Sequence, residues 1–223
     1  AAVDAIPQER DETHWRAGLA EARRIMKPLL DTPNGPTTPW FGIIGNSHID
    51  TAWLWPLAET WRKCARTFSS VLNLMEQYPE FLFVQPASCH AEMAEQLYPE
   101  IFGRVRAMVK KGRWEPNGGT WVEPDGNMPS GEAFIRQFLV GQATTRRMFG
   151  YTSDTLWMPD TFGYSAALPQ IMRGCGVAFF CTQKISWNDT TTFPHDTFYW
   201  RGIDGSEVLA HFNTTYVIPP TVA

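Results

Sequence analysis

The sequence has few of the features that mark membrane proteins and nucleic-acid-binding proteins. No apolar run in its 223 residues approaches the roughly 18 residues that cross a bilayer, and its charged N-terminus is unlike a secretory signal. Basic residues form no block beyond the short segment at 108–113, and the formal net charge is −4. We therefore expect neither a membrane nor nucleic acid as a partner.

Cysteine is also scarce. The four cysteines, Cys64, Cys89, Cys175 and Cys181, show no C-x-x-C spacing and lie in apolar or helix-like surroundings. This pattern favours buried free thiols in a reducing compartment over disulfides. We accordingly expect a cytoplasmic location.

The composition is that of a globular protein with many tryptophans and prolines. Apolar residues make up 43% and charged residues 19% of the chain, and its length fits one ordinary domain. Many of the 10 Trp and 17 Pro fall in loops between periodic segments, as expected where loops build an aromatic-lined pocket. Such a pocket suits a carbohydrate.

Helix-like and strand-like segments alternate along the chain. Residues 11–30 form an amphipathic pattern that ends at a Pro/Gly cluster, so we expect residues 1–36 to be an N-terminal helix and linker. Further helices are predicted at 61–75, 89–97, 99–111, 131–148 and 166–174. Strands are predicted at 40–44, 81–84, 113–115, 155–157, 177–181, 197–200 and 207–212, the last two joined by a hairpin turn at 203–206.

This alternation predicts an α/β fold with a mainly parallel sheet or barrel. In such folds functional residues gather at the C-terminal ends of the strands. Polar residues occupy those positions in this sequence: His48, Asp50, Glu123, Asp125, Asp160 and Lys184.

His48 and Asp50 lie two positions apart after the predicted strand at 40–44, so their side chains point to one face at its end. A nitrogen and an oxygen ligand there suit a divalent metal such as zinc, and Trp53 offers a flat apolar face for a sugar ring. A lone His-x-Asp pair is common and weak by itself. Asp160, between aromatic residues at a strand-to-loop junction, adds a second carboxylate, although it could instead cap the following turn.

Three longer motifs, in this order, resemble glycoside hydrolase family 38, the class II α-mannosidases: GNSHIDTAWLW at 45–55, GGTWVE at 118–123 and WMPDTFGYS at 157–165. DGNMPSGE at 125–132 and TQK at 182–184 are most similar to the cytosolic and vacuolar branch. The resemblance implies that residues 37–223 are the N-terminal part of a (β/α) catalytic domain, truncated and therefore incomplete. It also implies a zinc-dependent retaining hydrolase that acts on mannose-containing oligosaccharides.

Residue roles follow from the same resemblance. His48, Asp50 and Asp160 match three zinc ligands, and Asp160 also matches the catalytic nucleophile. The substrate-binding residues that it implies are Trp53, Phe162 and Lys184. The family's fourth zinc ligand and its acid/base lie in segments that this chain lacks, so we expect the isolated chain to be inactive or weakly active.

Two other functions are compatible with these residues. A zinc-dependent carbohydrate deacetylase also combines His and Asp at its metal on a related barrel, but it needs a metal-bound water rather than a nucleophilic Asp. The other alternative is a non-catalytic sugar-binding or docking fragment. The sequence leaves open whether the full-length protein forms a homo-oligomer.

Overall fold

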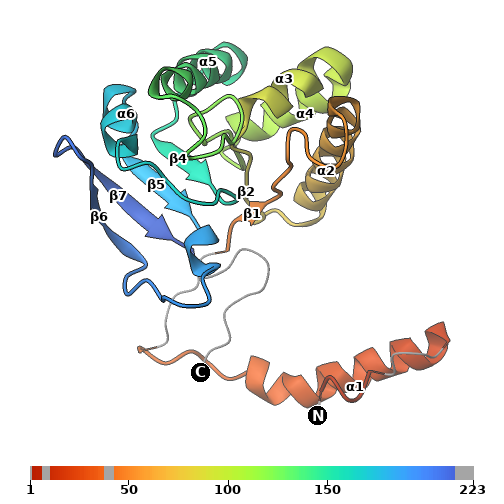
Figure 1. Cartoon of the computed structure of the whole chain (residues 1–223). Coiled ribbons are helices and arrows are strands. Elements are labelled where there is room, and N and C mark those ends of the chain that lie inside the picture. The colour runs from red at the N-terminus through yellow and green to blue at the C-terminus, as the bar shows by residue number, and fades with distance from the viewer. Residues whose placement is uncertain (1, 7–10, 38–42, 214–223) are drawn as a thin grey trace. The chain divides into compact units, whose positions relative to one another are not determined.

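The computed structural model describes residues 2–6, 11–37 and 43–213, and the chain divides into two compact units, residues 1–43 and 44–223 (Figure 1). The first unit holds helix α1 (Glu12–Leu30). Asp11 caps this helix, because its Oδ1 accepts hydrogen bonds from the backbone N–H groups of Thr13 and His14 at 3.0 and 3.2 Å. The domain division after residue 36 stays a prediction.

The second unit begins with a three-stranded parallel sheet. Its order is β1 (Gly45–Asn46), β2 (Phe83–Val84) and β3 (Trp114–Glu115). All three strands run in the same direction, so the loops that follow them lie at one edge of the sheet.

Three helices connect these strands and cover them. Helix α2 (Leu57–Gln77) joins β1 to β2, and helices α3 (Ser88–Leu97) and α4 (Pro99–Lys110) join β2 to β3. Their apolar residues recur at helical spacing and pack on the sheet, as the sequence pattern predicts. The buried core between them includes Phe68, Val71, Leu72, Met75, Phe83, Phe102, Val105 and Trp114.

The first strand starts later than predicted. Of the predicted strand at 40–44, residues 40–42 lie outside the described residues, and Ile43 and Ile44 are exposed and outside any strand. Pairing begins at Gly45, where a Cβ atom would lie only 2.6 Å from the ring of Phe81. A larger residue at this position would have to displace the Phe81 ring, and Ile43 and Ile44 are not part of the sheet.

A second, four-stranded sheet follows in the order β4 (Thr155–Met158), β5 (Phe179–Thr182), β7 (Glu207–Phe212) and β6 (Thr197–Arg201). The first three strands are parallel, and β6 pairs antiparallel with β7. The predicted hairpin is thereby confirmed.

Helices α5 (Gly131–Phe149) and α6 (Leu168–Gly174) accompany the second sheet, and helices α2 to α6 form an arc outside the strands (Figure 1). Ser130 caps α5 as predicted, since its hydroxyl accepts a hydrogen bond from the N–H of Ala133 at 3.2 Å. A short 3₁₀ helix, η1 (Lys184–Ser186), follows β5.

The two sheets meet beside β3 and β4. The N–H of Trp157 donates to the carbonyl of Gly118 at 3.4 Å, and the N–H of Gly118 donates to Oγ of Ser153 at 3.2 Å. The predicted α/β fold with mainly parallel strands is confirmed, and the strands of the described residues form no closed barrel.

Two expectations from the composition concern membrane-spanning segments and the state of the cysteines. Within the described part of the chain, no helix combines the length and apolarity needed to cross a membrane. All four cysteines are free thiols: Cys64 and Cys89 are buried, and Cys175 and Cys181 are partly buried. Burial raises the pKa of Cys64 and Cys89 to about 12, so both are unreactive thiols near neutral pH.

Candidate metal centre and active site

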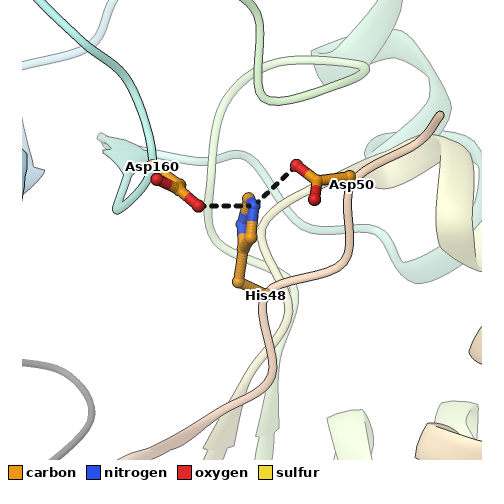
Figure 2. Close-up of side chains that lie close together, drawn as sticks. All are labelled: His48, Asp50 and Asp160. Atoms are coloured by element: carbon orange, nitrogen blue, oxygen red, sulfur yellow. Dashed lines mark hydrogen bonds and ion pairs between the residues drawn. The ribbon is translucent and has the colours of Figure 1, made fainter. Parts of the chain in front are cut away.

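His48, Asp50 and Asp160 meet in one small space. Figure 2 shows the His48 ring between the two carboxylates. Nε2 of His48 lies 3.2 Å from Oδ1 of Asp50 and 3.5 Å from Oδ2 of Asp160. One ligand atom from each of the three residues lies within 4.8 Å of the other two. Since His48 and Asp50 follow β1 and Asp160 follows β4, both sheets contribute to this site.

The spacing and the donor types suit a single divalent metal. Two ligands on a tetrahedral zinc, each about 2.0–2.2 Å from the ion, lie about 3.3–3.6 Å apart. Both distances from Nε2 of His48 are close to this range, and an imidazole nitrogen with two carboxylate oxygens is a set that zinc accepts. The residues therefore fit a metal, and their assignment as ligands stays a prediction.

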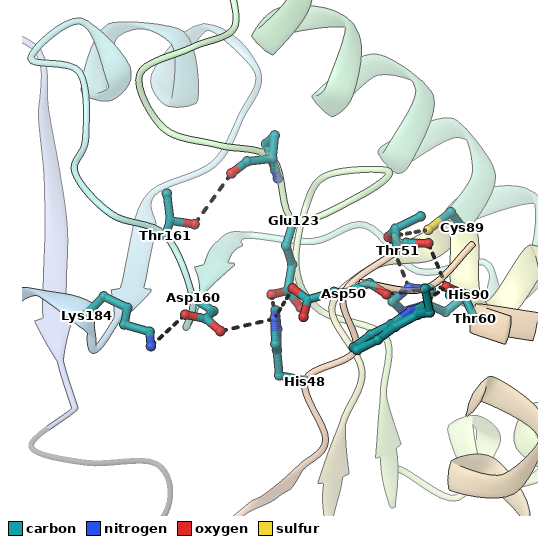
Figure 3. Close-up of polar contacts among 12 residues, drawn as sticks. His48, Asp50, Thr51, Thr60, Cys89, His90, Glu123, Asp160, Thr161 and Lys184 are labelled. Carbon is teal, nitrogen blue, oxygen red and sulfur yellow. Dashed lines mark hydrogen bonds and ion pairs between the residues drawn. The ribbon is translucent and has the colours of Figure 1, made fainter. Parts of the chain in front are cut away.

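A buried network holds the loop that carries His48 and Asp50 (Figure 3). Thr60 of α2 donates its hydroxyl to the carbonyl of Thr51 at 2.7 Å. The Thr51 hydroxyl lies 3.2 Å from Nε2 of His90, whose Nδ1 lies 3.1 Å from Nε2 of Gln85. Burial, with the charge of His48 as a second cause, lowers the pKa of His90 to about 4. A neutral His90 thus anchors the loop.

The loop that carries Asp160 packs closely on the segment before α5. The N–H of Ser165 donates to the carbonyl of Gly126 at 3.3 Å, and the Thr161 hydroxyl donates to the carbonyl of Pro124 at 3.5 Å. A Cβ atom on Gly126 would lie 2.2 Å from the carbonyl oxygen of Gly163. The two loops can approach this closely only because residue 126 has no side chain.

Lys184 lies beside Asp160 on the side away from His48 (Figure 3). Its Nζ is 2.8 Å from Oδ1 of Asp160, and its side chain is only 4% exposed. The same Nζ lies 3.1 Å from the ring centre of Trp187 and 4.9 Å from that of Phe162. Asp160 therefore presents one oxygen to the histidine and the other to a buried cation. The substrate-binding role of Lys184 stays a prediction.

Glu123 lies on the other side of the His48 ring. Its Oε2 is 2.6 Å from Nδ1 of His48, and its side chain is 7% exposed. Burial alone would lower the pKa of His48, but the carboxylates of Glu123 and Asp50 raise it to about 9. Burial raises the pKa of Glu123 above its usual value, and His48 opposes that shift. The site is therefore a compact cluster of one imidazole and three carboxylates.

Trp53 and Phe162, the aromatic residues expected at the sugar, are both 66% exposed. The ring of Trp53 packs edge-on against Trp55, with centroids 5.3 Å apart. Phe162 contacts Trp187 in the same manner, at 6.1 Å. Each lies on a loop that carries a candidate metal ligand and leaves much of its surface accessible. Their contact with a sugar stays a prediction.

A cavity of about 210 Å³ opens beside His48 and Asp50. Its wall also includes Trp55 and the cations Lys63 and Arg66 of α2. His48 and Asp50 thus border an open space that a small ligand can enter, whereas Asp160 is not part of its wall.

Glu123 is the residue whose part in this site the sequence did not indicate. The sequence places Glu123 in the loop after the predicted strand at 113–115, but its pattern gives this residue no role. One signal in the sequence could have revealed the role of Glu123. This residue directly follows Trp121 and Val122, in a short motif that begins with Gly118 and Gly119. An acidic residue among such apolar and small neighbours suggests a buried carboxylate.

Comparisons with known proteins identify the family. The model of the glycosyl hydrolases family 38 N-terminal domain matches residues 41–222. Alpha-mannosidase 2C1 of Homo sapiens is 54% identical over 168 residues, 75% of this chain and 16% of that protein. Alpha-mannosidase 2C1 of Mus musculus is 53% identical over 191 residues, 86% of this chain and 18% of that protein. Alpha-mannosidase of Saccharomyces cerevisiae is 48% identical over 169 residues, 75% of this chain and 16% of that protein. The chain therefore spans less than a fifth of the length of these relatives.

Solved structures share the fold. An alpha-mannosidase from Enterococcus faecalis V583 superposes with a TM-score of 0.63 at 22% identity, covering 76% of this chain and 19% of that chain. A 4-alpha-glucanotransferase from Thermococcus litoralis gives a TM-score of 0.58 at 17% identity, covering 76% of this chain and 26% of that chain. At such identities the likeness concerns the fold alone.

Proposed function

Because the chain belongs to glycosyl hydrolase family 38, we propose that it supplies the nucleophile and three metal ligands of an enzyme that hydrolyses α-mannosidic bonds. The substrates proposed are mannose-containing oligosaccharides, and the metal proposed is zinc. The relatives' names and the His48, Asp50 and Asp160 cluster support this function. The acid/base and a fourth metal ligand are expected outside this chain.

The observation that carries the proposal is that the two carboxylate oxygens of Asp160 have different partners. Its Oδ2 faces Nε2 of His48 at 3.5 Å, and its Oδ1 faces Nζ of Lys184 at 2.8 Å. The side chain is still 21% exposed, so a sugar can reach it. A carboxylate that is oriented on both oxygens and open to solvent suits a nucleophile better than a turn cap.

In the proposed reaction, Asp160 attacks the anomeric carbon of the mannoside as the bond from that carbon to the leaving oxygen breaks. The leaving oxygen takes a proton from the acid/base, and the sugar stays attached to Asp160 as an ester. Water, deprotonated by the same acid/base, then attacks the anomeric carbon and releases Asp160. Two displacements retain the configuration of the sugar.

The other residues of the site bind and orient. His48, Asp50 and Asp160 would hold the zinc, which would supply Lewis-acid contacts to sugar hydroxyls. Trp53 and Phe162 would pack on the apolar faces of the sugar. Lys184 would bind substrate and keep Asp160 in place. A cytoplasmic location of the complete protein, and whether it forms a homo-oligomer, stay predictions.

Trapping the covalent intermediate tests the proposal. The complete protein is incubated with a fluorinated mannosyl fluoride, which reacts in the first displacement and is slow in the second, and the digested protein is examined by mass spectrometry. We expect one added fluoromannosyl group on the peptide that contains Asp160, with fluoride released, and none in the Asp160→Asn variant. Release of acetate from an acetylated sugar without any adduct would instead favour the deacetylase. Binding of mannosides without either reaction would favour the sugar-binding fragment.

A further inference from the structure

Glu123 is a buried carboxylate whose polar contacts lead to one histidine. Its Oε2 lies 2.6 Å from Nδ1 of His48. Within the described part of the chain, neither of its oxygens has a hydrogen-bond partner apart from this contact with His48. A buried carboxylate normally replaces its lost hydration with several hydrogen bonds. Folding gains little from such a sparsely satisfied group, so its contact with His48 needs another explanation.

The two ring nitrogens of His48 face different groups (Figure 3). Nδ1 faces Glu123, whereas Nε2 faces Asp50 and Asp160 at 3.2 and 3.5 Å. When one nitrogen of a histidine binds a metal, a carboxylate at the other nitrogen fixes the ring and raises its strength as a ligand. We propose that Glu123 is a positioning residue, which accepts the Nδ1 proton of His48 and directs Nε2 toward a divalent metal between Asp50 and Asp160.

The backbone around Glu123 is held firmly enough for this role. The N–H of Trp121 donates to the carbonyl of Gln137 at 3.1 Å, and the N–H of Val122 donates to Oε1 of Gln137 at 3.0 Å. The indole N–H of Trp121 also donates to Oε2 of Glu92 at 3.3 Å. Helices α5 and α3 therefore fix the two residues that precede Glu123, and its carboxylate has a defined place.

His90 shows that burial of a histidine in this fold does not require a carboxylate. Its ring is fully buried, and its partners are the side chains of Gln85 and Thr51. These neutral groups satisfy both ring nitrogens. The carboxylate at His48 is therefore not explained by the need to bury the ring, whereas metal binding by the opposite nitrogen explains it.

This inference rests on the proposed metal site, and metal affinity tests the two separately. Zinc binding to the complete protein is measured by competition with a chromophoric chelator, in the wild type and in the variants Glu123→Gln and Glu123→Leu. Glu123→Leu removes the acceptor, and we expect about 10- to 100-fold weaker zinc binding. Glu123→Gln keeps the shape and one acceptor oxygen, so its affinity should fall between those of the wild type and Glu123→Leu.

A spectroscopic measurement separates positioning from a structural role. The visible spectrum of the cobalt-substituted protein depends on ligand geometry, and we expect it to change in both Glu123 variants. The matched control is Glu95→Gln, which alters a carboxylate of α3 that pairs with Arg147 at 2.7 Å and takes no part in the contacts of Trp121 or His48 described above. Its zinc affinity and cobalt spectrum should equal those of the wild type.

Two results would overturn the inference. If zinc affinity and the cobalt spectrum are unchanged in the isosteric Glu123→Gln variant and in Glu123→Leu, Glu123 is an ordinary buried ion-pair partner. If the wild-type protein binds no zinc, the proposed metal site is wrong and the positioning role is wrong with it. Should Glu123→Leu fail to fold, Glu123→Gln alone decides, because it fills the same volume.

Discussion

Replacement of Lys184 by alanine is the most direct test of how Asp160 is oriented. The substitution removes the cation 2.8 Å from Oδ1 of Asp160 and its contact with the Trp187 ring at 3.1 Å. Without it, the carboxylate can rotate about its last bond, and the oxygen that faces His48 is no longer fixed. We expect kcat to fall, because catalysis depends on a correctly placed nucleophile.

The size of the effect follows from the contact. A hydrogen bond between charged groups contributes about 1.5–3 kcal/mol, and each 1.4 kcal/mol corresponds to about tenfold in rate. Asp160 is 21% exposed, so water replaces part of the lost contact. These considerations give about a 10- to 100-fold lower kcat for Lys184→Ala, with a partial recovery in Lys184→Arg, which keeps the charge.

The assay is steady-state hydrolysis of an aryl α-mannoside by the complete protein. Lys27→Ala is the matched control, because Lys27 also pairs with an aspartate, Asp31 at 2.6 Å, but on the exposed surface of α1. It should leave kcat and the melting temperature unchanged, since exposed pairs contribute about 0–1 kcal/mol. A higher KM with unchanged kcat in Lys184→Ala would mean that Lys184 only binds substrate. Unchanged kcat and KM would refute the reasoning altogether.

Four further predictions concern chemistry and stability. Asp160→Asn should lower kcat on the order of 10⁴-fold in initial-rate assays, and near-normal turnover would exclude Asp160 as the nucleophile. Dialysis against a chelator should abolish mannosidase activity, and zinc should restore it; activity that survives verified metal removal contradicts the metal role. Burial lowers the pKa of His90 from 6.5 to about 4 in the folded protein. The contribution of the neutral His90 ring to stability is therefore complete above pH 6.5, and it is lost as the pH falls toward 4 because the unfolded chain then binds a proton that the folded protein does not. The free-energy advantage of the wild type over His90→Gln, measured by urea unfolding, should therefore shrink by about 2 kcal/mol between pH 7 and pH 5, and a constant difference would refute the neutral buried ring. Gly118→Ala should destabilise by about 1–3 kcal/mol in thermal melts, because the new Cβ would lie 2.3 Å from the carbonyl oxygen of Pro86; an unchanged melting temperature would contradict that close approach.

Periodicity was sufficient to predict the helices and the parallel topology. The apolar spacing in α2 and the cap at Ser130 are local signals, and local hydrogen bonds and one buried face determine both elements. The rule that parallel strands end at one edge predicted that His48 and Asp160 lie near each other, and their side chains do meet.

Tertiary packing determined what the sequence pattern could not predict. The apolar residues Ile43 and Ile44 look like strand residues, yet the strand starts at Gly45, where an added Cβ atom would lie 2.6 Å from the Phe81 ring. The burial of Glu123 likewise depends on segments far away in the sequence. Hydrophobic pattern gives the type of an element, but pairing register and the burial of one charge depend on distant neighbours.

The metal cluster draws its ligands from both sheets, and this has a mechanical consequence. An ion held by His48, Asp50 and Asp160 cross-links the loop after β1 to the loop after β4, across the seam where Gly118 meets Trp157. At a metal concentration 100 times the dissociation constant, such a cross-link stabilises the closed seam by about 2.7 kcal/mol. The amide hydrogen of Trp157 should then exchange more slowly with solvent when zinc is bound. Metal loss would thus loosen the joint between the sheets as well as stop the chemistry.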